Sequence, residues 1–153
     1  MIGSTKTVGE VMSEKVYTLP PNRTVFDASK FMVDHIITSV LIMEGNEIVG
    51  IITETDIIAK VVSKNLPSTT RICDVMSTKV ITIPSSTTVL AAGKLMEENH
   101  IKKLPVVDEG GLKGIVTNTD LTKSMRRTIV DKIMEMLGMK TGYGIAGKKG
   151  ARE

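Results

Sequence analysis

The sequence predicts an α/β (α+β) protein made of two tandem β-α-β-β-α units. The first observation is an internal repeat, because residues 8–61 align on residues 72–125 without a gap and about 18 of the aligned pairs are identical. The second is the apolar pattern, in which short continuous apolar runs alternate with apolar residues spaced three or four apart. The runs are typical of buried strands, and the spacing is typical of helices.

The first copy begins with an extended segment at residues 16–19, which Pro20 and Pro21 close. Thr24 is a good N-cap for the helix that follows. The apolar face of that helix is predicted to comprise Val25, Ala28, Met32 and Ile36.

The rest of the first copy predicts a hairpin followed by a second helix. Residues 40–43 form a continuous apolar run and predict a strand buried on both faces. A turn at residues 44–47 leads into a paired strand at residues 48–53. The helical stripe after Asp56 consists of Ile57, Ile58, Val61 and Val62.

The second copy predicts the same elements. They are a first strand at residues 80–83, the N-cap Thr88, a buried strand at 104–107, a turn at 108–111 and a return strand at 112–117. Pro105 lacks an N–H group, so we expect it where its strand starts or at a sheet edge.

The repeat divides the chain into a first unit at residues 7–64 and a second unit at residues 71–125. The linker between them, residues 65–70, is too short for the units to move independently. One unit alone would bury little surface, so we expect the two units to pack together.

The end of the chain differs from the repeat. Residues 121–137 can run as one longer helix that Gly138 ends, so residues 126–138 form an extension beyond the second unit. Residues 139–153 are rich in glycine and basic residues, show no core pattern and predict a flexible basic tail.

Composition limits the possible functions. Aromatic residues make up 3% of the chain, which disfavours a nucleic-acid surface that stacks bases on rings. No apolar run reaches the roughly 18 residues of a membrane helix, and the N-terminus lacks an apolar signal core. We therefore expect a cytoplasmic protein without a membrane partner. The one cysteine, Cys73, fits a reducing compartment and is expected to be a small buried residue.

Each copy contains a corner in which a strand ends in two threonines and an aspartate, and these corners have two interpretations. The residues are Thr53, Thr55 and Asp56 in the first copy and Thr117, Thr119 and Asp120 in the second. They could be helix starts, with the first threonine and the aspartate forming a capping box. They could also be ligand sites, because a helix N-terminus suits a phosphate and a carboxylate can accept hydrogen bonds from ribose hydroxyls.

Other motifs predict neither a metal nor a catalytic site. His35 and His100 have no acid or second histidine at metal-ligand spacing, and no partner marks Cys73 as a nucleophile. The chain has no phosphate-binding loop, and its one glycine-rich mimic, at residues 142–147, follows no strand. We therefore expect a protein that is not an enzyme and requires no cofactor or metal.

The order of motifs resembles a known family. Val11-Met12-Ser13, Thr18-x-Pro20, a capped helix, Leu104-Pro105-Val106-Val107-Asp108 and Gly114-Ile115-Val116-Thr117 with Asp120 look like the cystathionine-β-synthase (CBS) domain. Two in tandem resemble the pair called a Bateman module. The first copy departs from the family pattern at residues 40–42, where Val-Leu-Ile replaces Leu-Pro-Val.

The resemblance implies a fold and a class of ligand. Two such domains pack through their sheets about a pseudo-twofold axis, and the clefts between them resemble sites for AMP, ADP, ATP or S-adenosylmethionine. Modules of this kind commonly pair into a flat disc of four domains. Most are regulatory, and the resemblance implies no catalytic role.

In related modules each cleft takes its base pocket from one copy and its Thr-x-Thr-Asp corner from the other. By that pattern, the first cleft would comprise Val16, Thr18, Ile37, Thr38, Ser39, Lys102, Thr117, Thr119 and Asp120. The second would comprise Val80, Thr82, Ile101, Lys103, Thr53, Thr55 and Asp56. Because Thr38 and Ser39 stand where the second copy has Lys102 and Lys103, the clefts should differ, and we expect the first to bind better.

The sequence therefore predicts a regulatory module that senses adenine nucleotides and signals the bound state to a protein partner, as a homodimer. A ligand-free dimerising scaffold is the alternative from another class. A regulator that binds nucleic acid through the basic tail is a third hypothesis and is compatible with the first.

Overall fold

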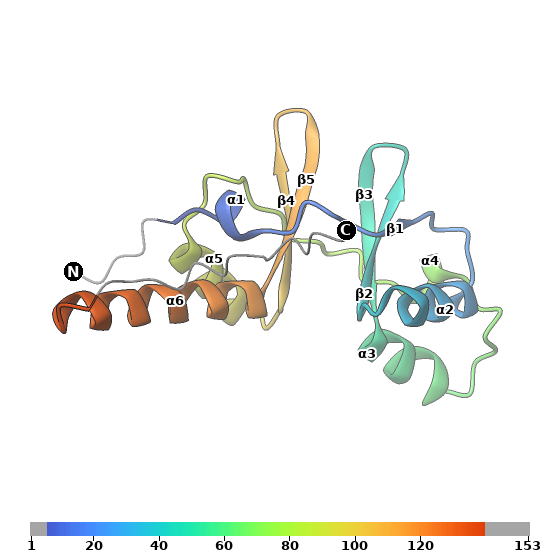
Figure 1. Ribbon diagram of the computed structural model, residues 1–153. Coiled ribbons are helices and arrows are strands. Elements are labelled where there is room, and N and C mark those ends of the chain that lie inside the picture. The colour runs from blue at the N-terminus through green and yellow to red at the C-terminus, as the bar shows by residue number, and fades with distance from the viewer. Residues whose placement is uncertain (1–5, 140–153) are drawn as a thin grey trace, which may run out of the picture.

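The computed structural model describes residues 6–139, and Figure 1 shows two units side by side. The first half contains α1 (Val8–Val11), β1 (Thr18–Leu19), α2 (Val25–His35), β2 (Ser39–Glu44), β3 (Glu47–Thr53), α3 (Glu54–Ile57) and the π-helical turn η1 (Ile58–Val62). The second contains α4 (Ile72–Val75), α5 (Val89–Glu98), β4 (Lys103–Asp108), β5 (Gly111–Thr117) and α6 (Asn118–Met136). The predicted mixed fold of two equivalent units is confirmed. The tail from residue 140 onward lies outside the described residues.

The two hairpins match each other in detail. β2 and β3 are antiparallel, and their register shifts between Ile42 and Met43. β4 and β5 repeat this pairing with the shift between Val106 and Val107, at the matching positions. Figure 1 shows the hairpin turns pointing away from α2, α3, α5 and α6, which lie near the other ends of the strands. In the first unit, Ser39 and Thr53 pair at these ends, and they lie just after α2 and just before α3.

The predicted strand at residues 80–83 is wrong, and that at residues 16–19 shrinks to β1. In the first unit, β1 pairs in parallel with β2, and Leu41 N donates to Tyr17 O at 3.2 Å. Pro105 occupies the position of Leu41 in the second unit and has no N–H group to donate. Only a single bridge, between Ile83 and Val106, remains there. Pro105 thus lies in an edge strand, as expected, because β4 and β5 form a two-stranded sheet.

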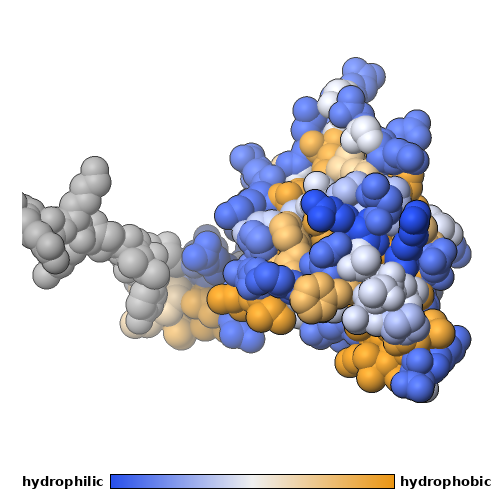
Figure 2. All heavy atoms as spheres, turned by 90° about the vertical axis from the view of Figure 1, so that its right-hand side faces the viewer, coloured by the Kyte–Doolittle hydropathy of each residue, from blue (hydrophilic) through white to orange (hydrophobic). Residues whose placement is uncertain are grey.

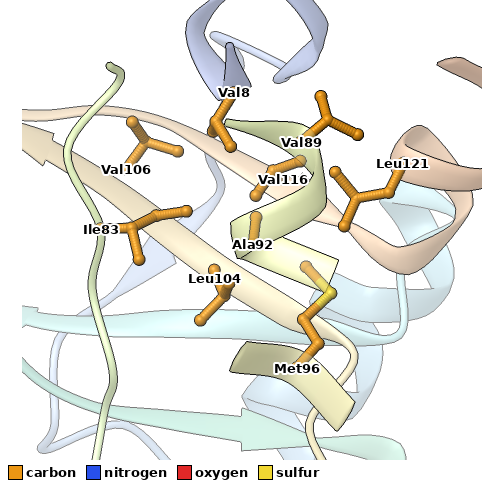
Figure 3. Packing of buried hydrophobic residues seen from close by; sticks show 9 residues of the cluster. All are labelled: Val8, Ile83, Val89, Ala92, Met96, Leu104, Val106, Val116 and Leu121. Carbon is orange, nitrogen blue, oxygen red and sulfur yellow. The ribbon is translucent and has the colours of Figure 1, made fainter. Parts of the chain in front are cut away.

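The first residues of each copy pack in the hydrophobic core of the other unit. Val8, from α1, is fully buried in the cluster of the second unit, and Figure 3 shows it among residues of α5, β4, β5 and α6. Ile72 and Val75, from α4, are buried in the cluster of the first unit. The backbone follows the same exchange, because Val89 N donates to Lys6 O and Val25 N donates to Thr70 O. The units therefore cannot separate without breaking both cores.

The exchange is reciprocal, as a twofold relation between the copies requires. Ser13 and Ile115 exchange two backbone hydrogen bonds of 2.9 Å, and Ser77 and Ile51 exchange two bonds of the same length. Each pair joins the end of a Val-Met-Ser segment of one copy to the return strand of the other.

Both predicted apolar helix faces in the first unit need correction. Ile36 caps α2 in a left-handed conformation with φ of 55° and is 93% exposed, because the helix ends before it. Ile58 and Val62 are exposed, while Val61 is buried. The π-helical turn, in which Ser63 N donates to Ile58 O, changes the angular spacing of side chains, so the α-helical stripe does not apply.

The long C-terminal helix is confirmed as α6, which begins at Asn118 and ends at Met136. The apolar face predicted from the sequence comprises Leu121, Met125, Ile129, Ile133, Met136 and Leu137. Only Leu121 of this face is buried, because the helix continues past the second unit (Figure 1). The prediction that Cys73 is buried is wrong, since the residue is exposed beside Asp74. Among residues 6–139, no helix combines the length and apolar sequence needed to cross a bilayer.

Candidate functional site

Two clefts lie between the units, and both draw on both copies of the repeat. The first has a volume of about 570 Å³. Of the residues expected there, the structure brings together Val16, Ile37, Thr38, Ser39, Lys102, Thr117 and Thr119. Thr18 and Asp120 are not part of its lining. The cleft thus combines residues 13–17 and 36–41 of the first copy with residues 102–103 and 115–119 of the second.

The second cleft has a volume of about 440 Å³ and is related to the first by the repeat. Of the residues expected there, it gathers Val80, Ile101, Lys103, Thr53, Thr55 and Asp56, but not Thr82. Lys102, Lys103 and Thr38 line both clefts. We expected Lys102 in the first cleft and Lys103 in the second, whereas the structure places both lysines at both clefts.

Thr18 and Thr82 do not line the clefts because the segments before them are not regular strands, so the alternation of a strand does not apply there. Two adjacent residues line each cleft instead, which are Val16 with Tyr17 and Val80 with Ile81. Tyr17 lines the first cleft in place of Thr18, and Ile81 lines the second in place of Thr82. Sequence reasoning also missed Lys15 and Lys79, although their identity in both copies next to these positions was a usable signal.

The Thr-x-Thr-Asp corners form capping boxes. Thr117 N and Oγ1 both donate to Asp120 Oδ2 at 2.8 Å, and Asp120 N donates back to Thr117 Oγ1 at 3.2 Å. Thr53 and Asp56 repeat the same bonds at the start of α3. The capping interpretation is therefore confirmed for the first threonine and the aspartate. Thr119 takes no part in the capping box and lines the first cleft.

Lys103 connects the two units at the boundary between the clefts. Its Nζ donates to Thr38 Oγ1 at 2.6 Å and to Ser39 Oγ at 2.7 Å. Ser39 is the residue that matches Lys103 in the first copy, so this contact joins equivalent positions. Burial lowers the pKa of Lys103 from its usual value, and the negative charge of Glu54 opposes that shift. An anion in either cleft would face this ammonium group.

The clefts differ in charge, as expected, although other residues cause the difference. The first contains Lys15 with the two shared lysines, and none of its lining residues between positions 6 and 139 is a carboxylate. The second contains Lys79 with the shared lysines, but it also contains Glu54 and Asp56. Asn118 occupies the position of Glu54 in the first cleft. The first cleft is therefore more favourable for a phosphate.

Metal ligation is not supported within the described part of the chain. No group of three or more His, Cys, Asp or Glu residues there could hold a metal ion. His35 instead packs its ring against Phe31 and Tyr17, at centroid distances of 4.2 and 4.6 Å. Of these three residues, Tyr17 also lines the first cleft.

Comparison with curated proteins reveals relatives across most of the chain. An uncharacterized protein of Methanopyrus kandleri is 42% identical over 118 residues, which are 75% of this chain and 60% of that protein. The CBS domain-containing protein YhcV of Bacillus subtilis is 30% identical over 75% of this chain and 82% of its own length. An inosine-5′-monophosphate dehydrogenase of Nitrosopumilus maritimus is 31% identical over 78% of this chain, but only 24% of the enzyme is covered.

Solved structures show the same fold. A signal-transduction protein with CBS domains from Burkholderia ambifaria has a TM-score of 0.75 and 34% identity, covering 78% of this chain and 93% of that one. A CBS domain pair in complex with 5′-methylthioadenosine and S-adenosyl-L-methionine has a TM-score of 0.71 and 30% identity, with coverages of 78% and 98%. CBSX2 in complex with AMP has a TM-score of 0.69 and 26% identity, with coverages of 80% and 97%.

The family model described as the CBS domain matches twice, at residues 8–63 and 72–127. These matches coincide with the two copies of the repeat and with the elements that line both clefts. The chain therefore belongs to the CBS domain family and carries two CBS domains in tandem.

Proposed function

We propose that the chain is a non-catalytic regulatory module that binds an adenosyl ligand (AMP, ADP, ATP or S-adenosylmethionine) in the first cleft and signals the bound state to a protein partner. The observation that carries the proposal is the lining of this cleft. Val16, Tyr17 and Ile37 supply apolar side chains from the first copy. The second copy supplies Lys102 and also Thr119, which lies in the first turn of α6. The volume of about 570 Å³ falls within the range of roughly 300–1,000 Å³ typical of small-molecule sites.

The two sides of the cleft suit the two ends of a nucleotide. A purine can pack on the apolar side, while the positive end of the α6 helix dipole and the lysines favour a phosphate. Related CBS pairs with AMP or with S-adenosyl-L-methionine support this class of ligand. The proposed site residues remain those that line the clefts, with the Thr-x-Thr-Asp corners contributing chiefly through Thr119 and Thr55.

A ligand held by both copies can act as a signal without catalysis. It shifts the chain toward one mutual arrangement of the units only by its differential affinity for that arrangement. The exchanged segments limit independent motion, because α1 and α4 are part of the opposite cores. Small changes at the cleft would therefore be passed to the surfaces of both units, where a partner could detect them.

The experiment that tests this function is a thermal-shift titration of the full chain with AMP, ADP, ATP and S-adenosylmethionine. A ligand at 100 times its Kd adds about 2.7 kcal/mol of stability, which raises Tm by roughly 5–10 °C for a chain of this size. Thr119→Val should remove most of this shift, because the valine cannot donate to a phosphate. Asp120→Ala is a poorer test, since it also removes the capping box of α6.

Thr55→Val is the matched control, because Thr55 occupies the equivalent position in the second cleft. This variant should keep the larger part of the ligand-induced shift. A Thr119→Val protein with the full shift would show that the assigned cleft does not hold the ligand.

The charge difference between the clefts predicts unequal binding. Calorimetry should show one ligand per chain that binds more tightly than a second. Glu54→Asn copies the residue of the tighter cleft into the weaker one and removes a carboxylate from its lining. We expect it to strengthen the weaker site about 3–10-fold. Two identical, independent sites in the unaltered chain would contradict the prediction.

The scaffold alternative is favoured by the apolar surface of the helices. Large apolar side chains are exposed along them, and these are Phe26, Val33, Ile58, Val62, Leu90, Met125, Ile129, Val130 and Ile133. Figure 2 shows apolar patches along the lower part of one face, the level at which the helices lie in Figure 1. Such patches mark interaction surfaces. We propose that they pair two chains into a four-domain disc, which sedimentation would detect as a dimer.

The effect of ligand on Tm distinguishes the ligand-sensing function from the scaffold function. A dimer that no adenosyl ligand stabilises would be a scaffold, whereas a ligand-dependent Tm identifies a sensor. Nucleic-acid binding through residues 139–153 stays a prediction. It is tested by salt-dependent binding that disappears when these residues are removed.

A further inference from the structure

A third cavity lies on the second unit and shares no lining residue with either cleft. Its volume is about 480 Å³, and it is formed by the N-terminal segment with α1 and by the first turns of α6. The lining residues are Lys6, Glu10, Val11, Asp120, Lys123, Ser124, Arg126 and Arg127. Asp120, which the sequence assigned to the first cleft, therefore lies here instead.

The repeat shows why this cavity is open in one unit. The residue that matches Ser124 in the first unit is Lys60. The Lys60 ammonium fills the corresponding space, with Nζ 2.9 Å from Asp56 Oδ1 and 3.0 Å from the carbonyl of Val75. Serine is too short to make these contacts. Ser124 is only 6% exposed, and its hydroxyl has no hydrogen-bond partner among the described residues.

The basic residues are also specific to the second unit. Lys6, Lys123, Arg126 and Arg127 correspond to Thr70, Ala59, Val62 and Ser63, none of which is charged. None of the four takes part in the ion pairs found within residues 6–139, which are Lys30–Asp34, Lys60–Asp56 and Lys94–Glu98. The first unit thus has one lysine with an internal ion pair at this place, whereas the second unit has four basic side chains around a cavity.

The two acids of the cavity do not neutralise this charge. Glu10 Oε2 accepts hydrogen bonds from Thr7 N and Oγ1, and Asp120 Oδ2 accepts them from Thr117 N and Oγ1. Both carboxylates are therefore engaged in capping boxes. Four basic groups against two acids leave an excess of positive charge around a buried hydroxyl that has no partner.

We propose that this cavity is a third binding site, specific to the second unit, for a small phosphate-bearing anion. The Ser124 hydroxyl would donate to a phosphate oxygen at the inner end, and the guanidinium and ammonium groups would hold the others. A small anion is favoured over a nucleic-acid strand because the unpartnered hydroxyl is buried at the wall of a cavity. The site is independent of the nucleotide function proposed for the clefts.

The site can be tested by amide NMR of the full chain during titration with inorganic pyrophosphate and, separately, with ribose 5-phosphate. The measurements use the Lys102→Glu background, in which the clefts are expected to bind phosphate groups much more weakly. Amides of residues 10–11 and 123–127 should shift with at least one of the two probes. The better probe shows whether the free anion or an organic phosphate ester is preferred.

Ser124→Lys is the decisive variant, because it copies the first unit. Its ammonium should reach Asp120 and the Val11 carbonyl as Lys60 reaches Asp56 and Val75, which fills the cavity without removing a basic residue. We expect pyrophosphate binding at least tenfold weaker. The double variant Arg126→Gln/Arg127→Gln changes only exposed side chains and should weaken pyrophosphate binding by a similar factor. It therefore tests the site even if Ser124→Lys does not fold.

Equal pyrophosphate affinity in Ser124→Lys and the parent would overturn the proposal, because binding would then come from surface charge alone. Absence of cavity shifts with both probes would also overturn it, as would binding of an oligonucleotide in place of either small phosphate. None of these outcomes affects the nucleotide function, which is read from the clefts by Tm.

Discussion

A chain in which Lys102 is replaced by glutamate is expected to bind adenine nucleotides about 30–100-fold more weakly in calorimetry. Lys102 is exposed and lines both clefts, so the change replaces an attraction to phosphate with a repulsion. Two unit charges 4 Å apart interact by about 4 kcal/mol near a protein surface. Exposure to solvent reduces this to roughly 1 kcal/mol for the attraction that is lost and roughly 1 kcal/mol for the repulsion that is gained. The free energy of unfolding of the free chain should change by no more than ~0.5 kcal/mol.

Lys64→Glu supplies the control for this prediction. Lys64 is also exposed and belongs to the lining of neither cleft, while the substitution changes the net charge by the same amount. Its affinity should stay within about twofold of the parent chain, as expected for a distant exposed charge. Equal loss in both variants would mean that overall charge, and not the clefts, governs binding.

Replacing Gly114 by alanine is expected to lower the free energy of unfolding by about 2–3 kcal/mol, as overpacking in a tight interior does. A Cβ at this position would lie 2.6 Å from the Ser13 carbonyl oxygen and 2.7 Å from Met12 Sδ. The Ser13 carbonyl cannot move away without breaking its hydrogen bond from Ile115 N. The added methyl group therefore disrupts the packing of Met12 and Ser13 against β5, and Tm should fall by roughly 4–12 °C.

Alanine at Gly93 should instead raise the free energy of unfolding. Gly93 lies within α5, and an added Cβ would meet only Leu121 Cδ1, at an ordinary distance of 3.8 Å. Alanine in a helix interior is better than glycine by about 0.5–1 kcal/mol, so chemical denaturation should show a small gain. If Gly114→Ala proved as stable as Gly93→Ala, the close contact between Ser13 and β5 would be absent in solution.

The sequence was sufficient for the features that depend on local pattern. The hairpins, the caps at Thr24, Thr88 and Thr117, and the long helix follow from apolar spacing, turns and capping residues. The repeat added the equivalence of the two units, and the family resemblance added the clefts between them. These features depend on neighbours in the chain or on matching positions, both of which are visible in a single sequence.

Features that depend on tertiary contacts were not predictable in the same way. Val8 and Ile72 each begin a short helix, but nothing in the local sequence shows that each is buried in the opposite unit. Only the direction of the side chains in space decides that Tyr17, not Thr18, lines the cleft. The difference between Lys60 and Ser124 was visible in the alignment, yet its meaning depends on the contacts that the lysine makes.

A crystal structure of the chain grown with AMP tests the binding cleft most directly. The purine should lie against Val16, Tyr17 and Ile37, with the phosphate beside Lys102, Thr119 and the first turn of α6. The second cleft should hold less nucleotide or none. A chain saturated with AMP whose first cleft stays free of nucleotide would contradict ligand sensing and leave a dimerising scaffold.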